Sequence, residues 1–209
     1  MAAADSVDFF EAQFRRQAEQ GEAVLNPFEI VALPHLRGSV LDLGCGMGNL
    51  ACEAARAGCS VQAFDASPTA IAHLRRRAQA EHLALQATCA DLRHQAFDGE
   101  YDAVVSIGLL MFFDCAGALQ LLRTIQRLVR PGGVAVVNVL VAGTTFTAMF
   151  GDAPHCLLAP GELERHFAGW TPLHTQRSEF EAPGATTKVF ETVVMRRPAR
   201  HDRPPATAA

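Results

Sequence analysis

The chain has 209 residues, of which 49% are hydrophobic and 19% are charged, and its formal net charge is −4. This length suits one domain with a large core and is short for two. The weakly acidic balance offers no basic surface for nucleic acid, and no apolar run reaches the roughly 18–20 residues that cross a bilayer. Because residues 1–5 also lack the basic start and apolar core of a secretory signal, we expect a cytoplasmic protein without nucleic-acid or membrane partners.

Two short helices are expected before the first strand. Phenylalanines recur at helical spacing after Ser6, which would cap the first helix. The second helix begins at Asn26, where Pro27 occupies the first helical position and Glu29 completes a capping box. This helix should end near Pro34.

A buried strand followed by a glycine loop comes next. Residues 40–43 form a short apolar run, as a parallel strand buried on both faces requires. Glycines then occupy every second position from Gly44 to Gly48, which lets the backbone turn sharply and approach a ligand. A helix is expected over residues 50–57, and a second strand over residues 61–64 leads to Asp65. A carboxylate at that strand end can accept two hydrogen bonds from a ribose diol.

The rest of the chain alternates helical and strand patterns. Helices are expected after Ser67, from Asp114 to about Val129, and over residues 160–167. Strands are expected over residues 83–89, 101–107, 134–141, 171–180 and 186–196. Arg75–Arg77 should face solvent, and Arg130–Gly133 should form a tight turn. This order predicts an α/β fold with a closing antiparallel hairpin.

The six cysteines form no C-x-x-C pair and lack the paired spacing of metal ligands. The even interval between Cys45, Cys52 and Cys59 suggests a metal site as an alternative, but Cys45 belongs to the glycine loop. Cys52 and Cys59 fit better as small buried residues. We therefore predict no metal, and free thiols in a reducing compartment.

The glycine loop resembles the first motif of class I S-adenosylmethionine-dependent methyltransferases. That motif reads hydrophobic-hydrophobic-Asp-hydrophobic-Gly-x-Gly-x-Gly, whereas dinucleotide-binding proteins use G-x-G-x-x-G. The resemblance covers residues 25–196 and implies a Rossmann-like, seven-stranded, mostly parallel sheet with a C-terminal antiparallel hairpin. Residues 1–24 would then form a helix that covers the site, and residues 197–209 a disordered tail.

A narrower resemblance is to the tellurite-resistance-type methyltransferases, which methylate tellurium or selenium oxyanions. It is carried by four segments: Phe97–Asp102, Leu110–Phe113, Arg130–Gly133 and Gly161–Trp170. The implied function is methyl transfer to tellurite or selenite as detoxification, with S-adenosyl-L-methionine as cofactor. Two alternatives remain open: methylation of a small organic metabolite, and a non-catalytic S-adenosylmethionine-binding protein. The sequence is compatible with a monomer or a homodimer.

The resemblance implies a cofactor site at the carboxyl ends of the parallel strands. Its expected members are Asp42, Gly44, Cys45, Gly46, Asp65, Ala66, Asp91, Leu92 and Ile107. The glycine loop would pass beneath the methionine part, and Asp42 would steady the loop or face the cofactor's amino group through water. Asp65 would hold the ribose, with Ala66 beside the adenine. Asp91 and Leu92 would meet the adenine edge, and Ile107 would lie near the sulfonium. Ser67 would lie beside the adenine or, preferably, act as a helix cap.

We expect no acid–base pair, because a soft nucleophile with a lone pair needs no base. An oxyanion does need cations, and the candidates are Arg15, Arg16, Arg177 and Lys188. The His-Arg pair that this family carries in its closing hairpin is missing here, which leaves the acceptor open. Met111, Phe112 and Phe113 either line a pocket or pack in the core. His155, His166 and His174 are weaker substrate candidates near the mouth of the site.

Overall fold

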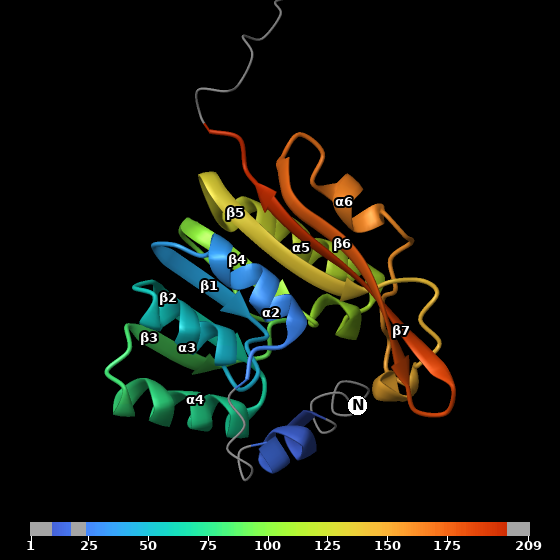
Figure 1. The fold of residues 1–209 in the computed structure, drawn as a ribbon, viewed down its shortest axis with the longest axis horizontal. Helices are drawn as coiled ribbons and strands as arrows, with labels where there is room; N and C mark the ends of the chain where they lie inside the picture. The colour runs from blue at the N-terminus through green and yellow to red at the C-terminus, as the bar shows by residue number, and fades with distance from the viewer. Residues whose placement is uncertain (1–9, 18–23, 200–209) are drawn as a thin grey trace, which may run out of the picture.

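A computed structural model describes residues 10–17 and 24–199. Its centre is one seven-stranded sheet with the order β3-β2-β1-β4-β5-β7-β6. The strands are β1 Ser39–Leu43, β2 Ser60–Asp65, β3 Leu85–Cys89, β4 Tyr101–Ile107, β5 Val129–Leu140, β6 Thr171–Ala182 and β7 Thr186–Arg196. Strands β1 to β5 pair in parallel, and β7 pairs antiparallel with both β5 and β6 (Figure 1). The predicted fold class is confirmed.

Helices cover both faces of this sheet. They are α2 Pro27–Ala32, α3 Asn49–Arg56, α4 Pro68–Ala80, α5 Cys115–Leu128 and α6 Glu162–His166, with 3₁₀ turns η1 Leu33–His35, η2 Leu110–Phe112 and η3 Ala148–Phe150. In Figure 1, α2 and α3 lie in front of the sheet and α5 lies behind it. Residues 10–17 are also helical, while the predicted cap Ser6 lies outside the described residues. No helix in the described part of the chain has the length and apolarity to cross a membrane.

The predicted helix caps are present. The Asn26 side chain accepts hydrogen bonds from the amides of Phe28 and Glu29, and the Glu29 carboxylate accepts one from the Asn26 amide, which completes the capping box. Ser67 caps α4 through the Ala70 amide, and Asp114 caps α5 through the Gly117 amide. Each cap satisfies backbone donors that a helix start leaves without partners.

Two apolar layers hold the sheet between them. Neighbouring residues of a strand face opposite layers. Val104 and Val137 pack with α5, while Val105 and Val136 pack with α3 and α4. The central strands are therefore buried on both faces, which explains why their sequences are almost continuously apolar.

The start of β5 differs from the prediction. Val129 is the first residue of β5 and pairs with Tyr101, and Arg130–Gly133 belong to the strand although Gly132 has a φ of +80°. The Gly132 amide donates to the Arg197 carbonyl, and the Arg197 amide donates to that of Gly133. The predicted helix from Asp114 to about Val129 is confirmed by α5, which ends at Leu128. The predicted tight turn was wrong, because Arg130–Gly133 form an irregular stretch inside β5, between the pairs Tyr101–Val129 and Ala103–Val134. Pro131 also disfavours a helical Arg130.

The expectation of free thiols was wrong for one pair. Cys115 and Cys156 form a disulfide whose Cα atoms are 4.8 Å apart. Their separation of 41 residues hides the pairing, which depends on a loop after β5 returning to the start of α5. Cys45, Cys52 and Cys59 are buried free thiols, as expected of packing residues. Within residues 10–17 and 24–199, no cluster of three or more His, Cys, Asp or Glu side chains suits a metal ion.

Candidate active site

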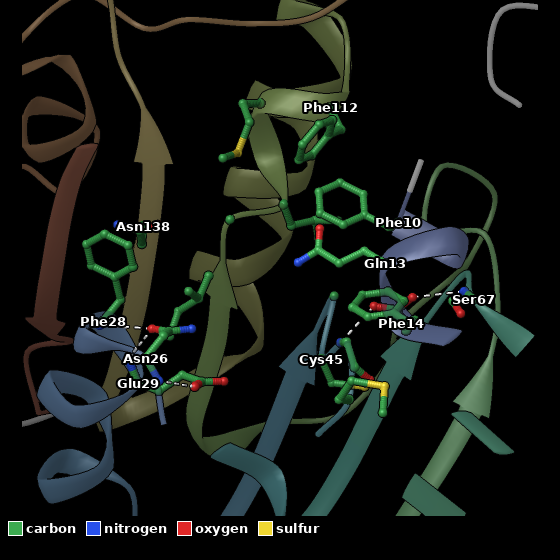
Figure 2. Close-up of a pocket in the computed structure, with 18 of the residues that line it drawn as sticks. Phe10, Gln13, Phe14, Asn26, Phe28, Glu29, Cys45, Ser67, Phe112 and Asn138 are labelled. Carbon is green, nitrogen blue, oxygen red and sulfur yellow. Dashed lines mark hydrogen bonds between the residues drawn. The ribbon is translucent and has the colours of Figure 1, made fainter. Parts of the chain in front are cut away.

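A cavity of about 710 Å³ opens where the parallel strands end. This volume lies within the roughly 300–1,000 Å³ of small-molecule sites. All nine predicted cofactor residues line it: Asp42, Gly44, Cys45, Gly46, Asp65, Ala66, Asp91, Leu92 and Ile107. Figure 2 shows Cys45 and Ser67 on one side of the cavity and Asn138, Phe28 and Glu29 on the other.

The glycine loop needs its glycines for both conformation and space. Gly44, Gly46 and Gly48 have φ values of +76°, +51° and +71°, a region that side chains with a Cβ rarely adopt. A Cβ at Gly48 would lie 2.4 Å from a methyl carbon of Leu74, and one at Gly46 would lie 3.3 Å from the Phe14 ring. Gly48 therefore permits close packing of α4, and Gly46 permits close approach of the Phe14 ring to the loop.

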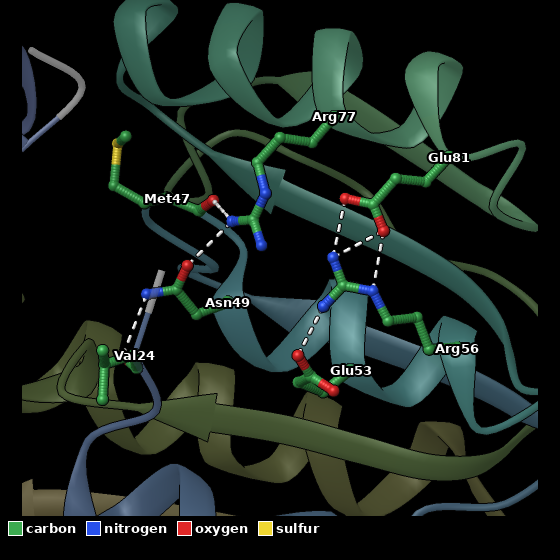
Figure 3. A network of polar contacts seen from close by, with 7 residues as sticks. All are labelled: Val24, Met47, Asn49, Glu53, Arg56, Arg77 and Glu81. Carbon is green, nitrogen blue, oxygen red and sulfur yellow. Dashed lines mark hydrogen bonds and ion pairs between the residues drawn. The ribbon is translucent and has the colours of Figure 1, made fainter. Parts of the chain in front are cut away.

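A network of polar contacts anchors the far end of this loop (Figure 3). The Arg77 guanidinium donates to the Met47 carbonyl at 3.4 Å and to the Asn49 side-chain oxygen at 2.8 Å. Asn49 in turn donates to the Val24 carbonyl at 3.2 Å. The prediction that Arg75–Arg77 simply face solvent was therefore wrong for Arg77, whose role depends on how α4 packs beside the loop. Arg75 also bonds backbone, through the Ala87 carbonyl at 2.8 Å.

Asp65 ties two segments of the site together. One carboxylate oxygen accepts the Gly46 amide and the other accepts the Ser67 amide, each at 2.8 Å. Burial raises the pKa of Asp65, while these hydrogen bonds lower it. The side chain thus orients the glycine loop and the start of α4. Ser67 is the cap of α4, as preferred from the sequence, and it also lines the cavity.

A second acidic group lies beneath the loop. Asp42 is 5% exposed, and burial, reinforced by the negative charges of Glu29 and Asp65, raises its pKa to about 8. Burial also raises the pKa of Glu29, which lines the cavity from α2. Clustered carboxyl groups with raised pKa values favour a positively charged ligand, because a nearby cation stabilises their ionised forms.

The other predicted cofactor contacts differ in exposure. Leu92 is buried, whereas Asp91 is exposed and is held by the Arg93 guanidinium at 2.8 Å. The hydrogen bond from Arg93 lowers the pKa of Asp91. Ile107 ends β4, as predicted, and lines the cavity beside the glycine loop.

The helix at residues 10–17 lies against the cavity. Phe14 faces Gly46, and the ring of Phe10 meets that of Phe112 edge to face with centroids 5.0 Å apart. The Glu11 carboxylate accepts hydrogen bonds from the hydroxyls of Ser67 and Thr69. The predicted covering role of segment 1–24, of which residues 1–9 and 18–23 lie outside the described residues, stays a prediction.

The predicted acceptor-binding cations are scattered. Lys188 lines the cavity. Arg15 is exposed and pairs with Glu11 at 3.5 Å, and Arg16 is also exposed. Arg177 is exposed on β6, outside the cavity lining.

The predicted histidine candidates also lie outside the lining. His155 stacks on Phe150, His166 pairs with Glu162 and His174 contacts Gln176. Met111, Phe112 and Phe113, by contrast, line the cavity. Met111 and Phe113 are at the same time part of the buried core.

Several lining residues were missed from the sequence. Asn138 is fully buried within the apolar run of β5, and a lone amide in such a run was the available signal. Phe28, Phe146 and Phe190 also line the cavity. Phe28 lies in α2, Phe146 lies in the segment that follows β5, and Phe190 lies in β7. The residues next to each of them in the sequence give no sign of a binding site.

Known proteins resemble this chain in sequence. A family model described as a methyltransferase domain matches residues 40–133. A probable S-adenosyl-L-methionine-dependent methyltransferase, TehB of Haemophilus influenzae, is 26% identical over 169 residues, 78% of this chain and 54% of that protein. Hemagglutinin 1 of Eikenella corrodens is 30% identical over 131 residues, 62% of this chain and 43% of that protein. The chain thus spans about half the length of the curated relatives it matches.

The fold has a close counterpart among solved structures. The crystal structure of TehB from Haemophilus influenzae aligns with a TM-score of 0.73 at 19% identity, over 87% of this chain and 65% of that one. This likeness confirms the fold. Together with the sequence matches, it confirms the predicted resemblance to class I methyltransferases and, among them, to TehB.

Proposed function

We propose that this chain is an S-adenosylmethionine-dependent methyltransferase that acts on a small acceptor. The observation that carries the proposal is the left-handed glycine loop beside Asp65, within a fold shared with TehB. A side chain at Gly46 would be strained at φ +51° and would meet the Phe14 ring, so the bare backbone there lets the helix at residues 10–17 lie close to the loop.

The residues present fit this cofactor. Each Asp65 oxygen accepts one backbone amide and keeps a further lone pair for a ribose hydroxyl. Asp42 and Glu29 lie near the loop with raised pKa values, so a bound ammonium or sulfonium would offset the cost of their ionisation. These are the charges that S-adenosylmethionine brings.

When bound, the cofactor supplies an electrophilic methyl group, whose bond to sulfur breaks with its electron pair staying on sulfur while the acceptor's lone pair forms the new bond. The protein's part is to align the acceptor and to exclude water, which proximity and orientation accomplish. A tellurium or selenium lone pair has no proton to lose, whereas a hydroxyl, thiol or amine acceptor releases its proton to solvent. Phe14 and Phe10, on the helix at residues 10–17, line the cavity and serve the exclusion of water.

Two acceptor classes have support. Tellurite or selenite is favoured by the similarity to TehB and by the segments around Leu110–Phe113 and Gly161–Trp170. A small organic metabolite is favoured by the apolar lining that Phe28, Phe146 and Phe190 provide. A cytoplasmic location is also part of this proposal. The Cys115–Cys156 disulfide argues against that location, though not against the proposed reaction, because structural disulfides are rare in reducing compartments.

The test is a calorimetric titration of the purified protein with S-adenosylhomocysteine and, separately, with NADH. We expect binding of the first ligand alone. An acceptor screen with a labelled methyl donor follows, using tellurite, selenite and organic thiols, amines and hydroxyls. Tight NADH binding without S-adenosylhomocysteine binding would refute the proposal, and cofactor binding without turnover of any acceptor would favour a non-catalytic binding protein.

A further inference from the structure

The part of the cavity away from the glycine loop is walled by aromatic rings. Phe28 from α2 and Phe190 from β7 approach with centroids 4.8 Å apart, and Phe112 from η2 lies 5.3 Å from Phe150. Phe146 and Met149 line the same cavity from the segment after β5. Flat apolar walls of this kind fit a planar ring, because ring faces and edges pack well against one another.

One buried polar atom in this wall has no partner. Asn138 is fully buried and lines the cavity, and its side-chain nitrogen donates to the Thr192 hydroxyl at 2.9 Å. Its side-chain oxygen has no hydrogen-bond partner among the described residues. The Ser106 hydroxyl is in the same situation but does not line the cavity. A buried carbonyl oxygen without a donor is unfavourable, so the site suits a ligand that brings an O–H or N–H group.

A single cation faces the same region. Lys188 is half-buried, and its Nζ lies 4.6 Å from the centre of the Phe146 ring. No carboxylate in the described part of the chain forms an ion pair with it. Arg93 is the other cation of the lining, and Asp91 already holds it. Lys188 is therefore the group available to an acidic substituent.

The sheet register sets how far apart these two polar groups lie. Asn138 on β5 pairs with Thr192 on β7. Lys188 precedes Thr192 by four residues and faces the same side of β7, so its Cα lies about 13 Å from that of Thr192 along the strand. Phe190 stands between them on that face. The extended side chain of Lys188 and the aromatic ring of a bound ligand, lying against Phe190, together span this distance.

We propose that the acceptor is a small aromatic acid, an inference that rests on the proposed methyltransferase function. Its ring lies among Phe28, Phe146 and Phe190, its carboxylate pairs with Lys188, and its hydroxyl or ring N–H donates to the Asn138 oxygen. That hydroxyl oxygen or ring nitrogen takes the methyl group, and its proton passes to solvent. A tellurite or selenite anion fits this lining less well. It needs several donors, and the aromatic walls supply none.

The experiment measures binding by calorimetry to the full chain saturated with S-adenosylhomocysteine. The probes are 4-hydroxybenzoate, phenol, which lacks the carboxylate, benzoate, which lacks the hydroxyl, and tellurite. We expect 4-hydroxybenzoate to bind at least about tenfold more tightly than either partial probe, since each loses one directed interaction. Tellurite should show no binding at the same concentrations.

Two variants assign these differences to the residues. Lys188→Met should remove the advantage of 4-hydroxybenzoate over phenol and leave phenol binding unchanged. Asn138→Leu should remove its advantage over benzoate and leave benzoate binding unchanged. The matched control is Arg123→Met, which removes an exposed cation of α5 outside the cavity lining. Unchanged S-adenosylhomocysteine binding and melting temperature would show that each variant is folded.

Three results would overturn the inference. One is equal binding of 4-hydroxybenzoate and phenol to the wild-type protein. Another is an unaltered preference for the acid in Lys188→Met. The third is no binding of any aromatic probe together with methylation of tellurite, which would leave the proposed function intact. Failure of S-adenosylhomocysteine itself to bind would instead refute the proposed function.

Discussion

Replacing Asp65 by alanine should have two separable effects, one on stability and one on cofactor binding. The carboxylate accepts the amides of Gly46 and Ser67 at 2.8 Å each. Removing it leaves two partly buried donors without their charged acceptor. A hydrogen bond to a charged group contributes about 1.5–3 kcal/mol, and water replaces part of that at a half-buried site. The ligand-free protein should therefore lose roughly 2–4 kcal/mol of unfolding free energy.

The effect on cofactor binding comes from the remaining lone pairs of the same carboxylate. Two hydrogen bonds from ribose hydroxyls would be lost, and the glycine loop would no longer be held in its binding conformation. Losing even one bond of about 1.5 kcal/mol weakens binding by roughly tenfold. We expect the dissociation constant for S-adenosylhomocysteine to rise by at least that factor.

Both effects are measurable on the same samples. Thermal unfolding of Asp65→Ala should show a melting temperature lower by roughly 4–16 °C, since about 1 kcal/mol shifts a domain of this size by about 2–4 °C. Calorimetry well below that temperature gives the affinity of the folded protein. Asp98→Ala is the matched control, because Asp98 is exposed and lies outside the cavity lining. A destabilised Asp65→Ala protein with unchanged affinity would show that Asp65 only holds the loop.

Three further changes have defined outcomes. Gly46→Val should abolish S-adenosylhomocysteine binding in calorimetry, because a branched side chain at φ +51° is strained and its Cβ would meet the Phe14 ring. Asp42 has a folded-state pKa of about 8, above its unfolded value. Its contribution to the free energy of unfolding therefore falls by up to about 1.4 kcal/mol per pH unit as the pH rises from about 4 to 8. In urea unfolding, the free energy of unfolding of Asp42→Asn should depend less on pH than that of the wild type. Reducing the Cys115–Cys156 disulfide should cost roughly 2–5 kcal/mol and lower the melting temperature, while an unchanged value, or a mass map with both thiols free, would contradict the pairing.

The position of the glycine loop at the cavity could be predicted because its signals are local in sequence. Gly44, Gly46 and Gly48 need positive φ values, and the strand before them leads directly into the loop. The position of Asp65 at the end of the next strand could be predicted in the same way, while its cofactor role stays a prediction. Its bonds to the loop and to α4 were not foreseen, since they depend on how close the two strand ends lie.

Long-range contacts explain what the sequence did not reveal. Arg77 appeared as a solvent-facing arginine, yet it bonds the loop end because α4 packs against Gly48. The Cys115–Cys156 disulfide and the early start of β5 at Val129 likewise depend on segments that meet only in the folded chain. The spacing of residues in the sequence does not indicate which distant segments come into contact in the folded chain.

Sequence similarity to known methyltransferases covers one part of the cavity better than the other. The matched family region, residues 40–133, contains the glycine loop, Asp65 and Ile107, so it covers the part of the cavity where we propose that the cofactor binds. Asn138 and Lys188 lie beyond that region, on β5 and β7. Apart from Phe112 of η2, the residues of the proposed acceptor end therefore lie in parts of the chain that the family model does not match. Its chemistry must be inferred from the cavity itself, where aromatic rings, one unpaired amide oxygen and one free ammonium among the described residues favour an aromatic acid over an oxyanion.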